Sequence, residues 1–231
     1  MEKTMTKYNE LVIDNLNRNF IANITDGVFF SFGMGFISMT TILPYFVSQL
    51  TNSKLVISMI VSIFMFGSTL PQLFAANYAE TLKRKKKAII IIGTFHRLPF
   101  LLLFIFTFIF TDTYSNLLLI LFYLCWTIYS MATGTVIPFW FDMLTKVIPM
   151  KFRGKFFGYI SFIGSILEVI GASIAGLIIK NYIFPLSFNI IFGLTTLALS
   201  ISFIALFFIK EPEYPTAKRK SGISSYIKNL R

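Results

Sequence analysis

Three ionisable residues stand in or beside long apolar stretches of the sequence, where charge is costly. They are Arg97, Glu168 and Asp26. At the centre of a lipid bilayer a charged side chain costs roughly 2.5 to over 10 kcal/mol, so residues of this kind usually bind an ion or a substrate, or carry protons. We therefore interpret these three residues as candidates for the path of a charged substrate or ion.

A structural role is the alternative for each of them. If their two stretches cross the membrane in the same direction, Arg97 and Glu168 lie at similar depth and can form a fixed ion pair between helices. Asp26 stands near the start of its stretch and can face the polar edge of the membrane. His96, beside Arg97, is explained by packing or by extension toward that edge.

Motifs for covalent catalysis, nucleotide binding or metal binding are missing from the sequence. It contains no Walker loop, dinucleotide-binding glycine pattern, zinc spacing or GxSxG nucleophile turn. Its one cysteine, Cys125, lies inside an apolar run, so no disulfide can form within the chain. We expect no catalytic residue, no metal and no cofactor, and a protein that is not an enzyme.

The composition indicates a helical membrane protein. Of the 231 residues, 55% are hydrophobic and only 13% are charged, whereas soluble domains average about 25% charged residues. The net charge of +11 would suit binding to nucleic acid. The basic residues, however, gather in the gaps between apolar runs and leave no soluble basic domain, so the lipid bilayer is the expected partner and nucleic acid is not.

Six apolar runs are long enough to cross a bilayer core of about 30 Å as helices. They cover residues 24–47, 55–78, 88–110, 117–140, 156–179 and 184–209. We accordingly predict an all-α membrane protein with six transmembrane helices. Residues 1–23 would form a cytoplasmic or interfacial N-terminus, 24–110 the first three helices, 111–209 the last three, and 210–231 a basic cytoplasmic tail.

The distribution of Lys and Arg predicts the orientation. Five consecutive cationic residues, 83–87, separate the second and third runs. With that loop in the cytoplasm, 18 of the 21 Lys and Arg residues fall on the cytoplasmic side and only Lys54 and Lys180 on the other. Both termini are then cytoplasmic, and the membrane is expected to be the inner or plasma membrane. Residues 223–230 predict either a short amphipathic helix on the inner leaflet or a disordered linker.

An internal repeat relates the two halves of the chain. Residues 41–51 and 135–145 share four identical positions, and both segments end a predicted span. Because the first span would end outside and the fourth inside, the similarity favours a 3+3 inverted repeat of the kind found in secondary transporters. Pro44 and Pro138 occupy matching positions, and each predicts a helix kink because proline removes a hydrogen bond and crowds the preceding turn.

Hydroxyl side chains gather in the fourth span, and two of them, Ser130 and Thr133, extend the candidate path. Polar groups on a spanning helix face protein or a water-filled cavity and avoid lipid. We expect both residues to line the same route as Arg97, Glu168 and Asp26.

The basic loop also carries a family resemblance. A loop pattern G-x-x-x-D-R-x-G-R-K is typical of the major facilitator superfamily. In this chain Glu80 falls on its acid, and Arg84 and Lys85 fall on its final basic pair, whereas Ala76 and Lys83 stand where it has glycines. With six spans and a 3+3 repeat, the chain resembles the N-terminal half of such a transporter.

The next cytoplasmic loop resembles the family as well. Asp142, followed by Arg153-Gly154 and Gly158, is similar to the D…RGxxxG pattern at the same place. The glycine–proline pair of drug–proton antiporters is missing from the fifth span. The resemblance implies transport of a small solute by alternating access. It also implies a cytoplasmic gate whose charges join helix ends: Glu80, Arg84, Lys85, Asp142 and Arg153.

Other functional hypotheses remain beside that one. Six helices supply one wall of a transporter, so we expect a second six-helix half or a second copy of this chain as partner. A six-span subunit driven by a separate ATPase predicts co-purification with that ATPase. A non-functional fragment predicts poor accumulation in the membrane, and a membrane-embedded enzyme predicts a bound metal or a hydrolysed lipid. The sequence does not identify the substrate, the coupling ion or the direction of transport.

Overall fold

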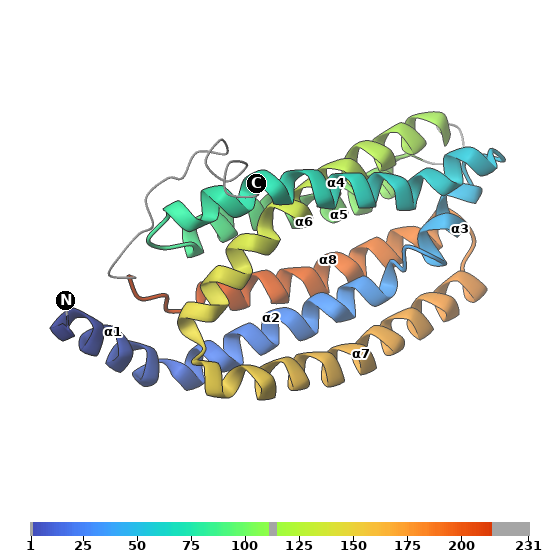
Figure 1. Cartoon of the computed structure of the whole chain (residues 1–231). Helices are drawn as coiled ribbons and strands as arrows, with labels where there is room; N and C mark the ends of the chain where they lie inside the picture. The colour runs from blue at the N-terminus through green and yellow to red at the C-terminus, as the bar shows by residue number, and fades with distance from the viewer. Residues whose placement is uncertain (1, 111–114, 214–231) are drawn as a thin grey trace.

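The computed structural model describes residues 2–110 and 115–213, and within them the chain is entirely α-helical. The predicted helix in the tail lies outside the described residues. Eight helices are present in this part of the chain (Figure 1). They are α1 (Glu2–Asp14), α2 (Leu16–Phe36), α3 (Ile42–Ser48), α4 (Lys54–Thr81), α5 (Lys86–Ile109), α6 (Ser115–Val147), α7 (Met150–Asn181) and α8 (Leu186–Phe207).

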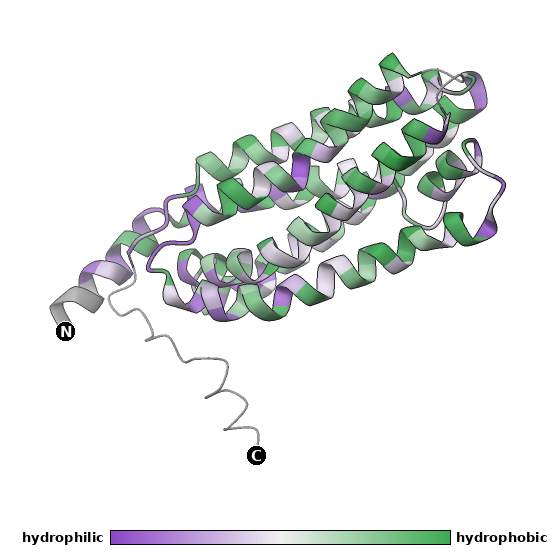
Figure 2. Cartoon of the chain, turned by 90° about the horizontal axis from the view of Figure 1, so that it is seen from above, coloured by the Kyte–Doolittle hydropathy of each residue, from purple (hydrophilic) through white to green (hydrophobic). Residues whose placement is uncertain are grey.

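Five of these helices, α4 to α8, are long and apolar enough to cross a membrane. They contain 22 to 33 residues, or about 33 to 50 Å at 1.5 Å per residue, against a hydrocarbon core of about 30 Å. Figure 2 shows hydrophobic residues along most of their length and hydrophilic residues toward the ends of the bundle. The chain is therefore a multi-pass membrane protein.

The first predicted span is not one continuous helix. α2 already begins at Leu16 and ends at Phe36, and the short α3 follows after a break at residues 37–41. Pro44 stands in the first turn of α3, where its ring would clash with the carbonyl of Thr40 if the helix continued. Hydroxyl side chains in the break bond locally, including Ser38 to Thr40 over 3.3 Å, and compete with helical hydrogen bonding. The chain thus breaks where the prediction placed a kink.

The helices form two groups of three. α2, α7 and α8 lie in one layer and α4, α5 and α6 in the other (Figure 1). α7 packs on α2, α2 on α8, α8 on α5, α5 on α6, and α6 on α4. The outermost helices, α4 and α7, consequently leave much of their surface uncovered.

Glycines bring two helix pairs into close contact. A Cβ atom on Gly134 of α6 would lie 2.2 Å from the carbonyl oxygen of Ser68 on α4. A Cβ atom on Gly35 of α2 would lie equally close, 2.2 Å, to the carbonyl oxygen of Glu168 on α7. Small residues of this kind let the backbones of membrane helices approach.

Two hydrophobic clusters fill the bundle, one toward each end. On α5, Ile89 belongs to one cluster and Phe100 to the other; on α8, Leu206 and Leu199 divide in the same way. α2 and α6 also contribute to both clusters. Between the two clusters these four helices carry polar side chains, which form the site described below.

Four segments far apart in the sequence meet at one end of the bundle, which we call the basic end. They are α1 with the start of α2, the loop between α4 and α5, the corner between α6 and α7, and the chain after α8. The Tyr8 hydroxyl donates to the Lys146 carbonyl over 3.0 Å. Asn19 and Lys210 exchange two hydrogen bonds of 3.0 and 2.8 Å. These contacts fix the ends of helices that the sequence separates by more than a hundred residues.

Candidate functional site

The polar side chains between the two hydrophobic clusters form what we call the polar band. An ion pair between Asp26 of α2 and Arg97 of α5 lies at its centre. The Arg97 Nη2 atom is 3.0 Å from the Asp26 Oδ1 atom, and the two side chains are only 12% and 9% exposed. Ser202 of α8 bridges the pair, because its hydroxyl donates to Asp26 over 2.6 Å and accepts from Arg97 over 2.8 Å. Three helices thus meet at one carboxylate oxygen.

The rest of the Arg97 guanidinium is held by backbone and by an aromatic ring. Its Nε atom donates to the Leu199 carbonyl over 3.2 Å, and its Nη1 atom is 3.5 Å from the Gly93 carbonyl. The guanidinium carbon lies 5.1 Å from the centre of the Phe203 ring, an attractive cation–π geometry. Arg97 is therefore held in one orientation.

His96, the neighbour of Arg97, is buried in an aromatic stack that joins α2 to α6. Its ring lies between Phe30, at 5.4 Å, and Tyr129, at 4.8 Å. The His96 Nε2 atom is 2.9 Å from the Thr133 hydroxyl, which itself donates to the Tyr129 carbonyl over 2.8 Å. A hydroxyl has one hydrogen to donate, so Nε2–H is the donor toward Thr133.

A cavity of about 310 Å³ opens beside these groups. Its walls combine aromatic and aliphatic side chains with a few polar ones. The lining includes Asp26, Phe30, Ser31, His96, Arg97, Thr133, Ile137, Trp140 and Phe141. Ligand sites in proteins commonly have this composition, in which apolar walls enclose the ligand and a few polar groups orient it. The arrangement can hold a small solute against aromatic rings. Asp26 and Arg97 both line the cavity, so a charged group of the solute could contact either of them.

Three of the five predicted path residues meet at this cavity, and two do not. Asp26, Arg97 and Thr133 line it. Ser130 is fully buried in the contact between α6 and α4, packs against Gly67, and does not line the cavity.

Arg97 and Glu168 do not form the ion pair that their similar depth allowed, because Arg97 pairs with Asp26. Glu168 is exposed on α7. Its backbone carbonyl lies against Gly35. Asp26 was expected near the start of its span and instead lies well inside α2, since α2 begins at Leu16.

Ser202 is a site residue that the sequence analysis missed. It is one of several hydroxyl residues in α8, and most of those bond to their own helix, as Thr195 does over 2.9 Å. Only its burial between Asp26 and Arg97 distinguishes it. Trp140, which also interacts with the Asp26 carboxylate, was likewise treated only as the end of a span.

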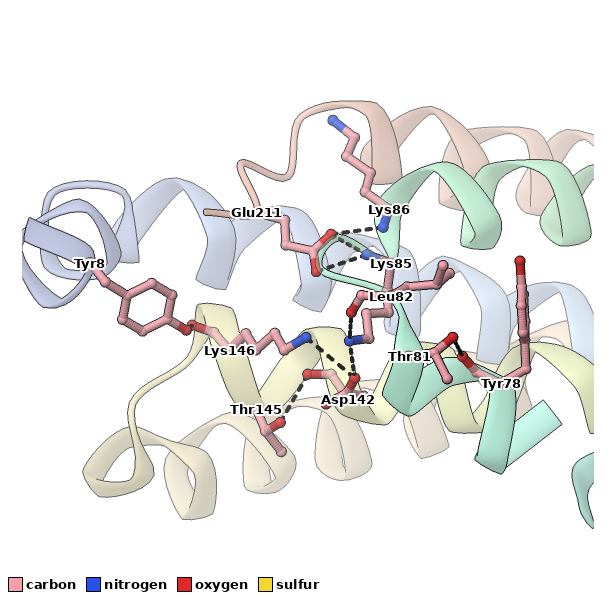
Figure 3. A network of polar contacts seen from close by, with 10 residues as sticks. All are labelled: Tyr8, Tyr78, Thr81, Leu82, Lys85, Lys86, Asp142, Thr145, Lys146 and Glu211. Atoms are coloured by element: carbon pink, nitrogen blue, oxygen red, sulfur yellow. Dashed lines mark hydrogen bonds and ion pairs between the residues drawn. The ribbon is translucent and has the colours of Figure 1, made fainter. Parts of the chain in front are cut away.

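A second polar cluster lies at the basic end (Figure 3). The Lys85 ammonium, only 2% exposed, lies 2.6 Å from an Asp142 carboxylate oxygen. Lys146 reaches the same oxygen over 3.4 Å from one turn further along α6. Lys85 also donates to the Leu82 carbonyl. The loop between α4 and α5 is thereby attached to α6.

Glu211, in the chain after α8, binds the start of α5. Its carboxylate accepts from the Lys85 backbone N–H over 2.9 and 2.7 Å and from the Lys86 backbone N–H over 2.8 Å. A carboxylate at a helix N-terminus satisfies unpaired N–H groups and interacts favourably with the helix dipole. Glu211 was not among the expected gate residues; its position directly after the last apolar run was the available signal.

The remaining predicted gate residues make other contacts. Arg84 lies 3.7 Å from Glu213, with both side chains 59% exposed. Arg153 donates to the carbonyls of Ile148 and Thr145 over 3.1 and 2.7 Å, so it stabilises the corner between α6 and α7. Glu80 is exposed in the last turn of α4.

The remaining predictions concern the helix kink at Pro138, metal binding and Cys125. Pro138 lies inside α6, which continues as a helix to Val147. No cluster of three or more His, Cys, Asp or Glu side chains suited to a metal ion occurs in residues 2–110 and 115–213. Cys125 is buried.

Comparison with known proteins gives the family. The model of the Major Facilitator Superfamily matches residues 27–230. Among curated proteins and solved structures, none matches the chain significantly. The matched residues include all five candidate membrane spans and most of the cavity lining, and they begin one residue after Asp26. The chain therefore belongs to the Major Facilitator Superfamily, whose members are membrane transporters and not enzymes.

Proposed function

We propose that this chain is one half of a secondary transporter that moves a small solute across the membrane by alternating access. The observation that carries the proposal is the cavity beside the buried Asp26–Arg97 pair. A buried pair is costly to desolvate, and a charge within a membrane is by default a functional group. A solute anion can replace Asp26 as the partner of Arg97, and a proton can neutralise Asp26.

The basic end is proposed to face the cytoplasm. Support comes from the Lys and Arg residues, 18 of 21 of which lie in the segments assigned to that side, and from the contacts that bring those segments together. Positive residues resist translocation, so their clustering favours a cytoplasmic location. The membrane would then be the inner or plasma membrane.

The proposed 3+3 inverted repeat is supported by the pattern of helix packing. One unit consists of α2 with α3, α4 and α5, and the other of α6, α7 and α8. Exchanging the units turns the α2–α7 contact into the α6–α4 contact, and the α2–α8 contact into the α6–α5 contact. Each unit thus packs its first helix on the second and third helices of the other. α2 and α6 correspond in this scheme, and both line the cavity.

A cytoplasmic gate is proposed at the basic end. Lys85, Asp142 and Glu211 are its best-supported members, because they connect the α4–α5 loop to α6 and to the chain after α8. Pairs of this kind can break and re-form as helix ends separate. Glu80, Arg84 and Arg153 are assigned to the rim of the gate.

A second half is proposed to close the cavity on the side of α4 and α7. Glu168 is exposed well inside the apolar length of α7, and lipid is an unfavourable neighbour for a carboxylate. Three glycines of α7 also face open space. A Cβ atom would have no atom within 4 Å at Gly154, Gly158 or Gly176. A further set of membrane helices, supplied by another half or by a second copy of this chain, fits that surface.

Solute profiling in the cells that make the protein tests the proposal. Cells with the wild-type chain are compared with cells carrying Arg97→Gln at equal membrane level, and the internal and external pools of small solutes are measured. At least one solute should be distributed differently, and Lys180→Gln, which changes an exposed charge at the other end of the bundle, should match wild type. Identical pools in all three strains would contradict transport through this site.

A further inference from the structure

An apolar groove of about 320 Å³ runs between α2 and α8 next to the basic end. Its floor is formed by two buried alanines, Ala22 and Ala205, one from each helix. Exposed side chains, among them Ile21 and Ile204, form its walls. The α2 residues of the groove, 18–25, span about 10 Å along the helix. Its shape is that of a furrow in which one extended chain can lie.

One cation lines this groove, and a second lies close by at the end of α8. Arg18 lines its end and donates through Nε to the Phe208 carbonyl over 2.7 Å. The Lys86 ammonium donates to the carbonyls of Phe207 and Ile209, each over 2.7 Å. Both cations therefore lie around the last turn of α8. Figure 3 shows the Lys86 side chain directed away from Asp142 and from the Lys85 ammonium, outside the gate cluster.

Both cations keep hydrogen-bond donors to spare. In the part of the chain that the structure describes, no carboxylate lies within ion-pair distance of Arg18 or Lys86. Glu211, whose charge acts on Lys86, uses its carboxylate on backbone N–H groups at the start of α5. The Nη groups of Arg18 and one N–H of Lys86 remain available to an anion.

We propose that this groove binds an anionic phospholipid from the membrane leaflet at the basic end. One acyl chain lies over Ala22 and Ala205, and the phosphate accepts hydrogen bonds from Arg18 and Lys86. The location suits such a ligand, because α8 ends at Phe207 and the cations stand where a membrane helix leaves the hydrocarbon. Basic pockets between membrane helices are general binding sites for anionic headgroups. The site is separate from the cavity at Asp26.

The purified full chain in mild detergent tests the proposal by native mass spectrometry. Phosphatidylglycerol and phosphatidylcholine with identical acyl chains are offered at equal concentration. The wild-type chain should retain one phosphatidylglycerol with a preference of about tenfold or more, since each cation near the headgroup favours an anionic lipid. In the double variant Arg18→Gln/Lys86→Gln this preference should fall to near equality. Glutamine keeps an amide donor for the end of α8, so the helix cap can remain while the charge is removed.

Two further variants separate charge from shape. Lys155→Gln removes an exposed cation elsewhere at the basic end and should leave the preference unchanged. Ala205→Leu fills the floor of the groove and should lower retention of both lipids although Arg18 and Lys86 are intact. Melting temperatures in phosphatidylcholine show that each variant is folded.

Three results would overturn the proposal. One is equal retention of the two lipids by the wild-type chain. Another is an unchanged preference in the folded double variant. The third is displacement of the lipid by glycerophosphoglycerol, the headgroup without acyl chains, at the same concentration as by the intact lipid, which would indicate a site for soluble anions.

Discussion

Asp26 of α2 and Arg97 of α5 form an ion pair with an N–O distance of 3.0 Å in the polar band between two hydrophobic clusters. The pair joins the two layers of the bundle, and Ser202 holds it from a third helix. Its position beside a cavity makes it the centre of the proposed transport site. Several testable consequences follow from how this pair and its surroundings are built.

Removing one charge of the pair should destabilise the protein more than removing both. Asp26→Asn leaves the buried Arg97 without its counter-charge, and we expect a loss of about 3 to 5 kcal/mol in unfolding free energy. The double variant Asp26→Asn/Arg97→Gln should recover most of that loss, because no charge is left unpaired. Denaturant unfolding in detergent measures the difference. If the loss in the double variant equals the sum of the losses in Asp26→Asn and Arg97→Gln alone, the two charges are not coupled.

Two glycines should not tolerate a methyl group. Gly35→Ala and Gly134→Ala each place a Cβ atom 2.2 Å from a carbonyl oxygen of the neighbouring helix, and the expected cost of overpacking is about 1 to 3 kcal/mol. Gly158→Ala is the matched control, since its Cβ atom would meet nothing within 4 Å. Alanine favours a helix over glycine by up to about 1 kcal/mol, so the control should be neutral or stabilising. Thermal melting of the three variants measures the difference, and a Gly35→Ala or Gly134→Ala variant as stable as Gly158→Ala would contradict the close contacts.

His96 should contribute through both its ring and its Nε2–H group. His96→Phe keeps an aromatic ring between Phe30 and Tyr129 but loses the hydrogen bond to Thr133, which is worth about 1 kcal/mol. His96→Gln keeps a donor but loses two ring contacts, each worth about 0.5 to 1.5 kcal/mol. The glutamine variant should therefore be the less stable of the two. Nitrogen-15 NMR of the imidazole should find the hydrogen on Nε2, and a hydrogen confined to Nδ1 would contradict the assigned contact.

The gate contact should depend on Lys85 and hardly at all on Arg84. Lys85→Met leaves Asp142 without its closest partner, and with Asp142 one-third exposed the expected loss is about 1 to 3 kcal/mol. Arg84→Met breaks only the exposed contact to Glu213 and should cost about 1 kcal/mol or less. Amide hydrogen exchange at residues 82–86 reports the change locally. Faster exchange in both variants to the same extent would mean that Lys85 has no special role.

The membrane architecture could be predicted from the sequence because it depends on composition. Runs of about 20 apolar residues determine the membrane helices, and the predicted second to sixth spans coincide with α4 to α8. The break before Pro44 could not be predicted as such, since proline near a span end is compatible with a kink or a stop. The local hydrogen bond between Ser38 and Thr40, which competes with helical hydrogen bonding, is seen only in the structure.

The candidate site could be predicted only in part. Arg97 and Asp26 were identifiable as charges among apolar residues, but their pairing depends on how helices are rotated and packed. α7 is apolar on most of its faces, so its sequence does not show that Glu168 is exposed in the folded chain. Ser202 could not be separated from other hydroxyl residues until its three-dimensional neighbours were known.

Accessibility of the cavity from the two sides of the membrane tests the central claim most directly. Ile137 lines the cavity, and Ile137→Cys can be introduced with Cys125→Ala so that it carries the only thiol. Ile120→Cys on the same helix, exposed on the bundle surface, is the control for a site that faces lipid. The protein is kept in native membranes, together with whatever second half it assembles with.

A membrane-impermeant maleimide is then added to right-side-out and to inside-out vesicles. Alternating access predicts that Ile137→Cys is labelled from both sides, and that Ile120→Cys is labelled from neither. Labelling of Ile137→Cys from one side only, or from neither side, in intact and folded protein would contradict the account.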